Sequence, residues 1–182
     1  MRRLTNLEYL LLALLQQKPA SGYALRKSFA STPLGHYSDS PGSIYPALQR
    51  LRRRGLARPV KEPAPSGRGT QLFAVTPKAL VELRSWLHGP ITREEARNDL
   101  PALMLRFVIC AQLFGNAAAH KFLLQFGTQV HEIILELESY LRGPGKDLPM
   151  AGHLAVEQGL EGYRALADWI ARAGQQLARS SS

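Results

Sequence analysis

Cysteine is almost absent from the sequence: Cys110 is the only one, so no disulfide bond can form within the chain. A reducing compartment, the cytoplasm, is therefore the environment that we expect for the protein. Long apolar runs are absent as well, since no stretch approaches about 18 consecutive apolar residues, and we expect no membrane-spanning segment. The apolar run Tyr9–Leu15 begins directly after a glutamate and is followed by glutamines and a lysine, which favours a folded helix over a secretory signal.

The residues that catalysis requires do not gather in any recognisable pattern. The histidines are scattered and show neither a paired spacing nor a nearby cysteine pair, so the sequence predicts no zinc site. Cys110 lies inside an apolar helical run, where a buried and unreactive thiol is the expected state. No glycine-rich phosphate loop is present. We therefore expect no metal, no cofactor and no enzymatic activity.

Acidic residues are scarce in the first half of the chain. Residues 1–89 hold 14 Lys and Arg but only 4 Asp and Glu, a net charge of +10, whereas residues 90–182 hold 9 against 10, a net charge of −1. All of the excess positive charge therefore lies in the first half. This division predicts a basic domain, 1–89, that meets a polyanion and a nearly neutral domain, 90–182, with another role.

The first half begins with two short predicted helices. Thr5 and Glu8 form a Thr-x-x-Glu capping box that starts a helix at Asn6–Gln17, and a proline follows the helix end. Ser21 is a suitable N-cap for a second helix, Gly22–Ala30. A connection rich in Ser, Gly and Pro leads from there to the most basic element of the chain.

The stretch PGSIYPALQRLRRRGL predicts a third helix that starts at Ile44 with Ser43 as its N-cap. This start places Pro46 in the first turn, where a missing N–H is tolerated. Gly55 suits a left-handed C-cap at the helix end. With successive residues about 100° apart, one face is apolar and the other is polar. The apolar face holds Ile44, Ala47, Leu48 and Leu51, and the opposite face holds Pro46, Gln49, Arg50 and Arg53.

A predicted β-hairpin and a fourth helix complete the first half. Two alternating stretches, residues 56–62 and 70–76, flank a loop rich in Pro, Gly and Ser that carries Arg68 at its tip. Thr76 followed by a proline predicts the N-terminus of a helix that runs to about Leu87. The order helix, helix, helix, hairpin, helix is that of a winged helix-turn-helix with a two-stranded wing.

The second half has a helical period throughout. Asp99 caps a predicted helix that ends at Gly115, and Asn116 caps a long helix to Arg142. A third helix follows the turn at 143–149. Each of the last two helices carries an apolar seam with alternating spacings of 3 and 4 residues, which predicts an antiparallel hairpin with coiled-coil packing.

This hairpin presents more apolar surface than it can bury alone, so we expect it to be a dimerisation domain. The residues assigned to a homodimer interface are Leu123, Phe126, Val130, Ile133, Leu137, Tyr140, Tyr163, Leu166, Ile170 and Leu177. The predicted fold is therefore mainly α, with a winged helix-turn-helix followed by an antiparallel helical domain.

Three stretches within residues 7–89 are similar to a known family. SGYALRK, GSIYPALQRLRRRGL and LFAVTP, in this order and at these distances, resemble the PadR family of bacterial transcription regulators. The second half resembles the longer helical C-terminal domain of members related to virulence activators. The resemblance implies a homodimeric regulator that binds a palindromic operator of duplex DNA, with repression as the default. It also implies that Ser43 and Tyr45 face the DNA backbone.

We expect the helix at Ile44 and the hairpin to contact the DNA. Hydroxyls, cations and the exposed N–H groups of a helix N-terminus supply phosphate contacts, which give most of the affinity. Base reading falls to Gln49 and to Arg50, whose side chains can form bidentate hydrogen bonds in the major groove. The predicted DNA-binding residues are Tyr23, Ser43, Tyr45, Gln49, Arg50, Arg53, Arg54, Lys61 and Arg68.

Each of these assignments has a plainer alternative. The arginines at 52–54 can form a solvated helix end that the helix dipole favours, and Tyr23 or Tyr45 can be a packing residue. The family resemblance implies an apolar small-molecule effector near the junction of the two domains, so Trp86 is either part of such a site or a core tryptophan. The alternative function is a winged-helix scaffold for protein assembly, whose basic face binds an acidic protein.

Overall fold

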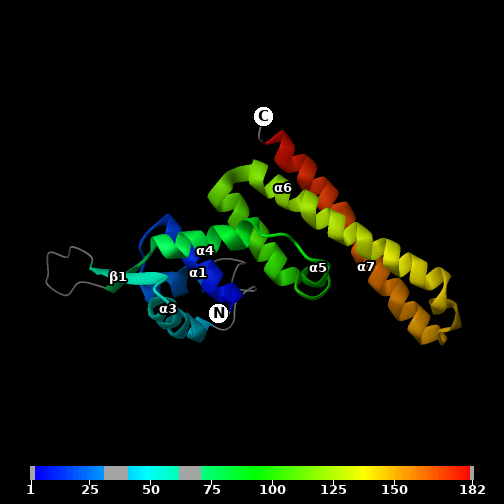
Figure 1. Ribbon diagram of the computed structural model, residues 1–182, viewed down its shortest axis with the longest axis horizontal. Coiled ribbons are helices and arrows are strands. Elements are labelled where there is room, and N and C mark those ends of the chain that lie inside the picture. Colours follow the sequence, from blue (N-terminus) through cyan, green and yellow to red (C-terminus); the bar gives the residue numbers. More distant parts are fainter. Residues whose placement is uncertain (1–2, 31–40, 62–70, 181–182) are drawn as a thin grey trace. The chain divides into compact units, whose positions relative to one another are not determined.

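The computed structural model describes residues 3–30, 41–61 and 71–180 of the 182-residue chain. The chain divides into two compact units, Met1–Gly89 and Pro90–Ser182. Both units are mainly helical, and the first carries a two-stranded antiparallel sheet (Figure 1). The fold class predicted from the sequence, a winged helix-turn-helix followed by a helical region, is therefore confirmed.

The first unit has the element order of a winged helix-turn-helix. Its elements are α1 (Asn6–Gln17), α2 (Gly22–Ala30), α3 (Ile44–Arg53), β1 (Ala57–Lys61), β2 (Gln71–Val75) and α4 (Pro77–His88). A short 3-10 turn, η2 (Pro41–Ser43), leads into α3. The predicted bounds of α1 and α2 and the predicted start of α3 agree with the structure.

Side-chain caps begin three of these helices as the sequence predicted. At α1, the Thr5 hydroxyl accepts the N–H of Glu8 at 3.2 Å, and the Glu8 carboxylate accepts the N–H of Thr5 at 2.9 Å. Ser21 Oγ accepts a backbone N–H in the first turn of α2, and Thr76 Oγ1 does the same for α4. Ser43 is different, because its side chain makes no capping hydrogen bond to α3. Ser43 is the N-cap residue, as predicted, but the chain enters α3 from η2 with helical backbone angles at Ser43.

The end of α3 is a Schellman motif, as the glycine in the sequence indicated. Gly55 has a φ of 69°, in the left-handed region. Its N–H donates to the carbonyl of Arg52 at 2.9 Å, and the N–H of Leu56 donates to the carbonyl of Leu51 at 2.9 Å. Leu51 and Leu56 are both buried, which is the apolar contact that accompanies this motif. The motif therefore fixes the path from α3 into β1.

The core of the first unit forms between α1, α3 and α4. The largest fully buried side chains of the unit include Leu7, Leu10, Leu11, Leu12 and Leu15 of α1 and Ile44, Leu48 and Leu51 of α3. The Trp86 ring stacks on the ring of Tyr9, with centroids 4.0 Å apart and planes 5° from parallel. Burial, followed by the negative charge of Glu82, raises the pKa of Tyr9 above its ordinary value. Trp86 therefore packs in the core of the first unit.

The sheet of the first unit is anchored to the connection between α1 and α2. β1 and β2 pair antiparallel, with Pro59 opposite Phe73. Phe73 also exchanges two backbone hydrogen bonds with Ala20, at 2.9 and 3.1 Å. These bonds tie β2 to the residues directly before α2, so the wing and the helix-turn-helix share one framework.

The second unit contains α5 (Arg93–Asn98), α6 (Leu100–Arg142) and α7 (Met150–Arg179), with a 3-10 turn, η3 (Pro144–Asp147), between the last two. The sequence analysis missed α5, although Thr92 and Glu95 form a complete capping box at its start. Asp99 caps α6 as predicted, because its Oδ1 accepts the N–H of Ala102 at 3.2 Å. The predicted break at Gly115 is also present, since this residue has a φ of 81° and a ψ of −179° inside α6.

Helices α6 and α7 run side by side as an antiparallel hairpin, seen in yellow and orange in Figure 1. The two predicted seams pack against each other within one chain, joined by Phe107, which makes an edge contact with Trp169. Leu123, Phe126, Val130, Ile133 and Ile170 are buried in this way.

Within one chain, this packing uses most of the apolar surface that the sequence analysis assigned to a homodimer interface. Leu137, Tyr163, Leu166 and Leu177 are partly buried against the same intrachain core. A residue whose apolar surface is already buried in its own chain has little accessible apolar area that contact with a second copy could remove from water. Of the ten assigned residues, Tyr140 alone belongs to the exposed large hydrophobic residues of the described chain.

By length and composition, α6 is also the one helix among the described residues that could cross a membrane. The sequence analysis did not anticipate this, because it looked for uninterrupted apolar runs. The apolar window of α6 supplies the core of the second unit, and 33% of it is buried there. The core helix of a soluble protein passes the same test of composition.

Candidate nucleic-acid interface

Helix α3 separates a buried face from a polar one. Its apolar residues, Ile44, Ala47, Leu48 and Leu51, are fully buried. Tyr45, Gln49, Arg52 and Arg53 are exposed and follow each other at helical spacing. We call these four residues the α3 outer face. The sequence analysis named three of them as DNA-binding residues and left Arg52 out, although Arg52 lies about 20° from Tyr45 around the helix axis.

An exposed tyrosine of α2, Tyr23, lies beside this face in the sequence order of the helix-turn-helix, and Tyr45 of α3 contacts the start of α2. Tyr23 is 62% exposed and Tyr45 is 50% exposed, so neither is a core packing residue. The ring of Tyr45 lies against Gly22, where an ideal Cβ would be only 2.5 Å from Cε1 of the tyrosine. The guanidinium carbon of Arg26 lies 5.6 Å from the centre of the Tyr23 ring, in a cation–π contact. The start of α2 and the start of α3 therefore present aromatic and cationic groups together.

The structure gives Arg50 a different place from the one predicted. Its Nε donates to Oε1 of Glu8 at 2.6 Å, and the Glu8 side chain is only 2% exposed. A guanidinium held by a buried carboxylate is not free to reach a base edge in the same conformation. The Nε of Arg50 is therefore engaged with α1, and the assignment of Arg50 to base reading stays a prediction.

The remaining predicted residues lie at the edges of the α3 outer face. Ser43 precedes α3, and Arg54 follows its last turn, where the Arg54 carbonyl accepts a hydrogen bond from Lys78 Nζ at 3.0 Å. Lys61 is the last residue of β1, but its side chain lies outside the described part of the chain. Arg68 also lies outside the described residues.

Ion pairing differs between the two units. Within the described residues, Arg52 and Arg53 of α3 form no salt bridge, and the basic charge of this face is left to meet another molecule. In the second unit, by contrast, Arg93 and Arg97 pair with glutamates of α6, and Arg164 of α7 pairs with another. Several arginines of the second unit therefore pair within the unit, whereas the two arginines of the α3 outer face form no such pair among the described residues.

Nothing in the described ranges 3–30, 41–61 and 71–180 resembles a metal or catalytic centre. These residues contain no group of three or more His, Cys, Asp or Glu side chains that could hold a metal ion. Cys110 is buried, and this burial raises the pKa of its thiol above the ordinary value. A thiol with a raised pKa stays protonated and is a poor nucleophile.

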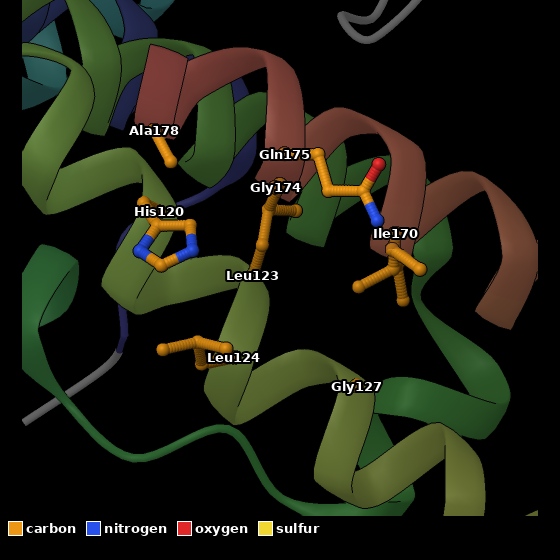
Figure 2. A pocket seen from close by; sticks show the side chains of 9 residues that line it. His120, Leu123, Leu124, Gly127, Ile170, Gly174, Gln175 and Ala178 are labelled. Carbon is orange, nitrogen blue, oxygen red and sulfur yellow. The ribbon is translucent and has the colours of Figure 1, made fainter. Parts of the chain in front are cut away.

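A cleft of about 470 Å³ lies between α6 and α7 in the second unit (Figure 2). Figure 2 shows Leu123 and Leu124 on α6 and Ile170 on α7 around it, with His120 and Gln175 as the polar groups at its wall. Its other lining residues are small: Gly127, Ala171, Gly174 and Ala178. The sequence analysis did not find this cleft, because only the pairing of two helices brings their small residues opposite each other.

Comparison with known proteins finds one family model that is similar to part of this chain. The model of the transcriptional regulator PadR-like family matches residues 11–85, which include α2, α3, the sheet and most of α1 and α4. No curated protein matches the chain.

Several solved structures are similar to this chain. Bacillus subtilis PadR in complex with operator DNA is 22% identical, with a TM-score of 0.42 over 93% of this chain and 97% of that one. The PadR-like transcriptional regulator BC1756 from Bacillus cereus is 19% identical, with a TM-score of 0.41 over 93% and 94%. The protein smu.1604c from Streptococcus mutans UA159 is 19% identical, with a TM-score of 0.40 over 91% and 96%. The family match shows that residues 11–85, which are less than half of the chain, are similar to the transcriptional regulator PadR-like family.

Proposed function

We propose that the protein is a cytoplasmic transcriptional regulator that binds duplex DNA through the α3 outer face. One observation carries this proposal: α3 buries its whole apolar face and exposes a tyrosine, an amide and two arginines on the other. A helix that is anchored on one side and presents such groups on the other suits the major groove. The +10 net charge of residues 1–89 provides the attraction to a polyanion.

The residues of the interface divide into two roles. Ser43, Tyr45 and the N-terminus of α3 contact phosphates, because hydroxyls and exposed N–H groups bind anionic oxygens. Arg52 and Arg53 add charge to the same contact. Gln49 reads a base, since its amide can form two hydrogen bonds with an adenine edge. Tyr23, Arg54, Lys61 and Arg68 extend the phosphate contacts on either side.

The proposed regulator acts as a homodimer on a palindromic operator. A single winged helix reads few base pairs, so specificity calls for two modules about one helical turn of DNA apart. Exposed apolar residues of the α6–α7 hairpin support a dimer: Leu135 is 49% exposed, Leu154 is 55% exposed and Met150 is 74% exposed. These residues, and not the two buried seams, are the proposed dimer contacts.

Repression is the default mode implied by the family resemblance, and we propose an apolar small molecule as the effector that relieves it. The cleft between α6 and α7 supports this part of the proposal. Its volume of about 470 Å³ falls within the range of roughly 300–1,000 Å³ found for ligand pockets, and its wall is apolar with two polar groups.

Selection of bound duplexes from a random DNA pool tests the function. The selected site should be a palindrome, and binding should weaken steeply with salt. If a dimer neutralises roughly 6–10 phosphates, log affinity falls against log salt with a slope of about −5 to −9. A slope shallower than about −2, or no enrichment of any duplex, would instead favour the scaffold that binds an acidic protein.

A further inference from the structure

Glu8 is a buried carboxylate of the first unit, and two of its hydrogen bonds reach different parts of the unit. It lies in the first turn of α1 and is 2% exposed. One oxygen, Oε2, accepts the backbone N–H of Thr5 at 2.9 Å and completes the capping box. The other, Oε1, accepts Nε of Arg50 on α3 at 2.6 Å. One side chain therefore joins the start of α1 to the helix proposed to read DNA.

Capping alone does not explain why this glutamate is buried. The same Thr-x-x-Glu box begins α5, where Thr92 and Glu95 form both of its hydrogen bonds at a solvent-exposed position. A buried carboxylate is costly unless a cation and hydrogen bonds compensate it. Glu8 differs from Glu95 in its pairing with Arg50, which links α1 to α3.

The position of Arg50 on α3 bears on how the helix is rotated about its axis. Arg50 lies at the border between the buried and exposed faces of α3, directly after Gln49 in the sequence. Apolar packing of leucines tolerates small rotations, because it is not directional. A charged hydrogen bond of 2.6 Å to a buried partner is directional and restricts that rotation. A rotated α3 would carry Tyr45 and Gln49 away from their positions.

We infer that Glu8 and Arg50 are positioning residues for DNA recognition: Glu8 holds Arg50 and so sets the rotation at which α3 presents Tyr45 and Gln49. The inference rests on the proposed DNA-binding function. It assigns a role to Glu8, whose side chain is buried and lies outside the α3 outer face, and it replaces base reading as the role of Arg50.

The test compares Glu8→Met, Arg50→Met and the double variant with wild type, and Arg53→Met is the matched control. Thermal unfolding is measured without DNA. Affinity is measured over a salt series for the selected site and for a random duplex. Methionine replaces either side chain with an apolar one of similar length. Glu8→Gln is included in case Glu8→Met does not fold, because glutamine keeps the size of the side chain and removes only its charge.

The inference predicts a pattern that differs from a direct contact. Arg50→Met and Glu8→Met should each lower the ratio of selected to random affinity by about tenfold or more, with the salt slope unchanged. The double variant should lose no more than either single variant, since both break one link. Glu8→Gln should lower the ratio in the same direction. Arg53→Met should leave the unfolding temperature unchanged and make the salt slope shallower by about one unit per module.

Two outcomes would overturn the inference. One is a shallower salt slope for Arg50→Met, equal to that of Arg53→Met, because this would make Arg50 a phosphate contact. The other is an unchanged affinity ratio for both Glu8 variants. Failure of the proposed function looks different: wild type itself would bind no duplex, while the unfolding data would still report whether Glu8 and Arg50 are coupled.

Discussion

The ring of Tyr45 fills the space beside Gly22 that a side chain would otherwise occupy. An ideal Cβ at Gly22 would lie 2.5 Å from Cε1 and 3.0 Å from Cζ of the tyrosine. The first residue of α2 therefore has to be glycine for the ring at the start of α3 to keep its position. This contact joins the two helices at the proposed phosphate-binding end of α3.

Gly22→Ala should weaken DNA binding without weakening the fold. The Tyr45 ring is half exposed and can move aside, so unfolding should be unchanged or more difficult by up to about 1 kcal/mol, as expected for Gly to Ala in a helix. DNA affinity should fall because the hydroxyl leaves its position. Gly159→Ala is the control, since its Cβ would meet no atom within 4 Å. Equal affinity of both variants would show that the ring position is irrelevant to binding.

Tyr45→Phe and Gln49→Ala should separate the two kinds of DNA contact on α3. Loss of the Tyr45 hydroxyl should weaken the selected site and random duplexes alike, because phosphates are the same in every sequence. Gln49→Ala should cost about 1–3 kcal/mol mainly on the selected site. Fluorescence anisotropy measures the affinity of each variant for both DNAs. An equal loss of affinity on both DNAs for Gln49→Ala would mean that Gln49 contacts phosphates and not a base.

Gly55→Ala should destabilise the first unit. Gly55 has a φ of 69°, and an L residue with a Cβ pays about 1–2 kcal/mol in this region. The loss should appear in urea unfolding of the first unit. Gly55→Asn is the matched control, because asparagine tolerates left-handed backbone and should cost less. If the two variants are equally stable, backbone strain at this C-cap does not cause the loss of stability.

Leu135→Glu combined with Leu154→Glu should convert a dimer into a monomer while the hairpin stays folded. Both side chains are largely exposed, so a charge there meets water in the monomer and apolar surface only in a dimer. Operator affinity should fall by about 10²-fold or more, since the second module is no longer held nearby. Analytical ultracentrifugation gives the oligomeric state.

Ile133→Glu is the contrasting variant for this experiment. Ile133 is 1% exposed within its own chain, so the charge should unfold the second unit and not merely separate two copies. A wild-type monomer in sedimentation, or an unchanged dimer with Leu135→Glu and Leu154→Glu, would contradict the proposed contacts.

Stability should fall at high pH through Cys110. Burial raises the pKa of this thiol in the folded chain above its ordinary value of 9.0, so the folded state binds the proton more tightly than the unfolded state does. The stabilisation is therefore complete below the unfolded pKa and is lost as the pH rises through the folded pKa. Unfolding measured from about pH 7 to pH 10 should show a steeper decline for wild type than for Cys110→Ala. Parallel curves would mean that the thiol does not titrate differently in the two states.

Features that depend on a few neighbouring residues could be predicted from the sequence. The capping box of Thr5 and Glu8, the caps of α2 and α4, and the left-handed Gly55 all follow from local hydrogen bonding and backbone sterics, which a short stretch specifies by itself. The order of the helices and the hairpin then indicated the winged helix-turn-helix. Helix α5 was missed, although the sequence contains the Thr-x-x-Glu capping box that Thr92 and Glu95 form at its start.

Only the tertiary structure decided which partners these elements take. Glu8 and Arg50 are 42 positions apart. The sequence predicts a capping role for Glu8 and base reading for Arg50, but it does not predict the ion pair that joins them. The same holds for the seams of α6 and α7. Their spacing predicts that each needs an apolar partner, yet whether that partner belongs to the same chain or to a second copy depends on how the chain turns at η3. A periodic pattern specifies a surface, whereas long-range packing chooses what covers it.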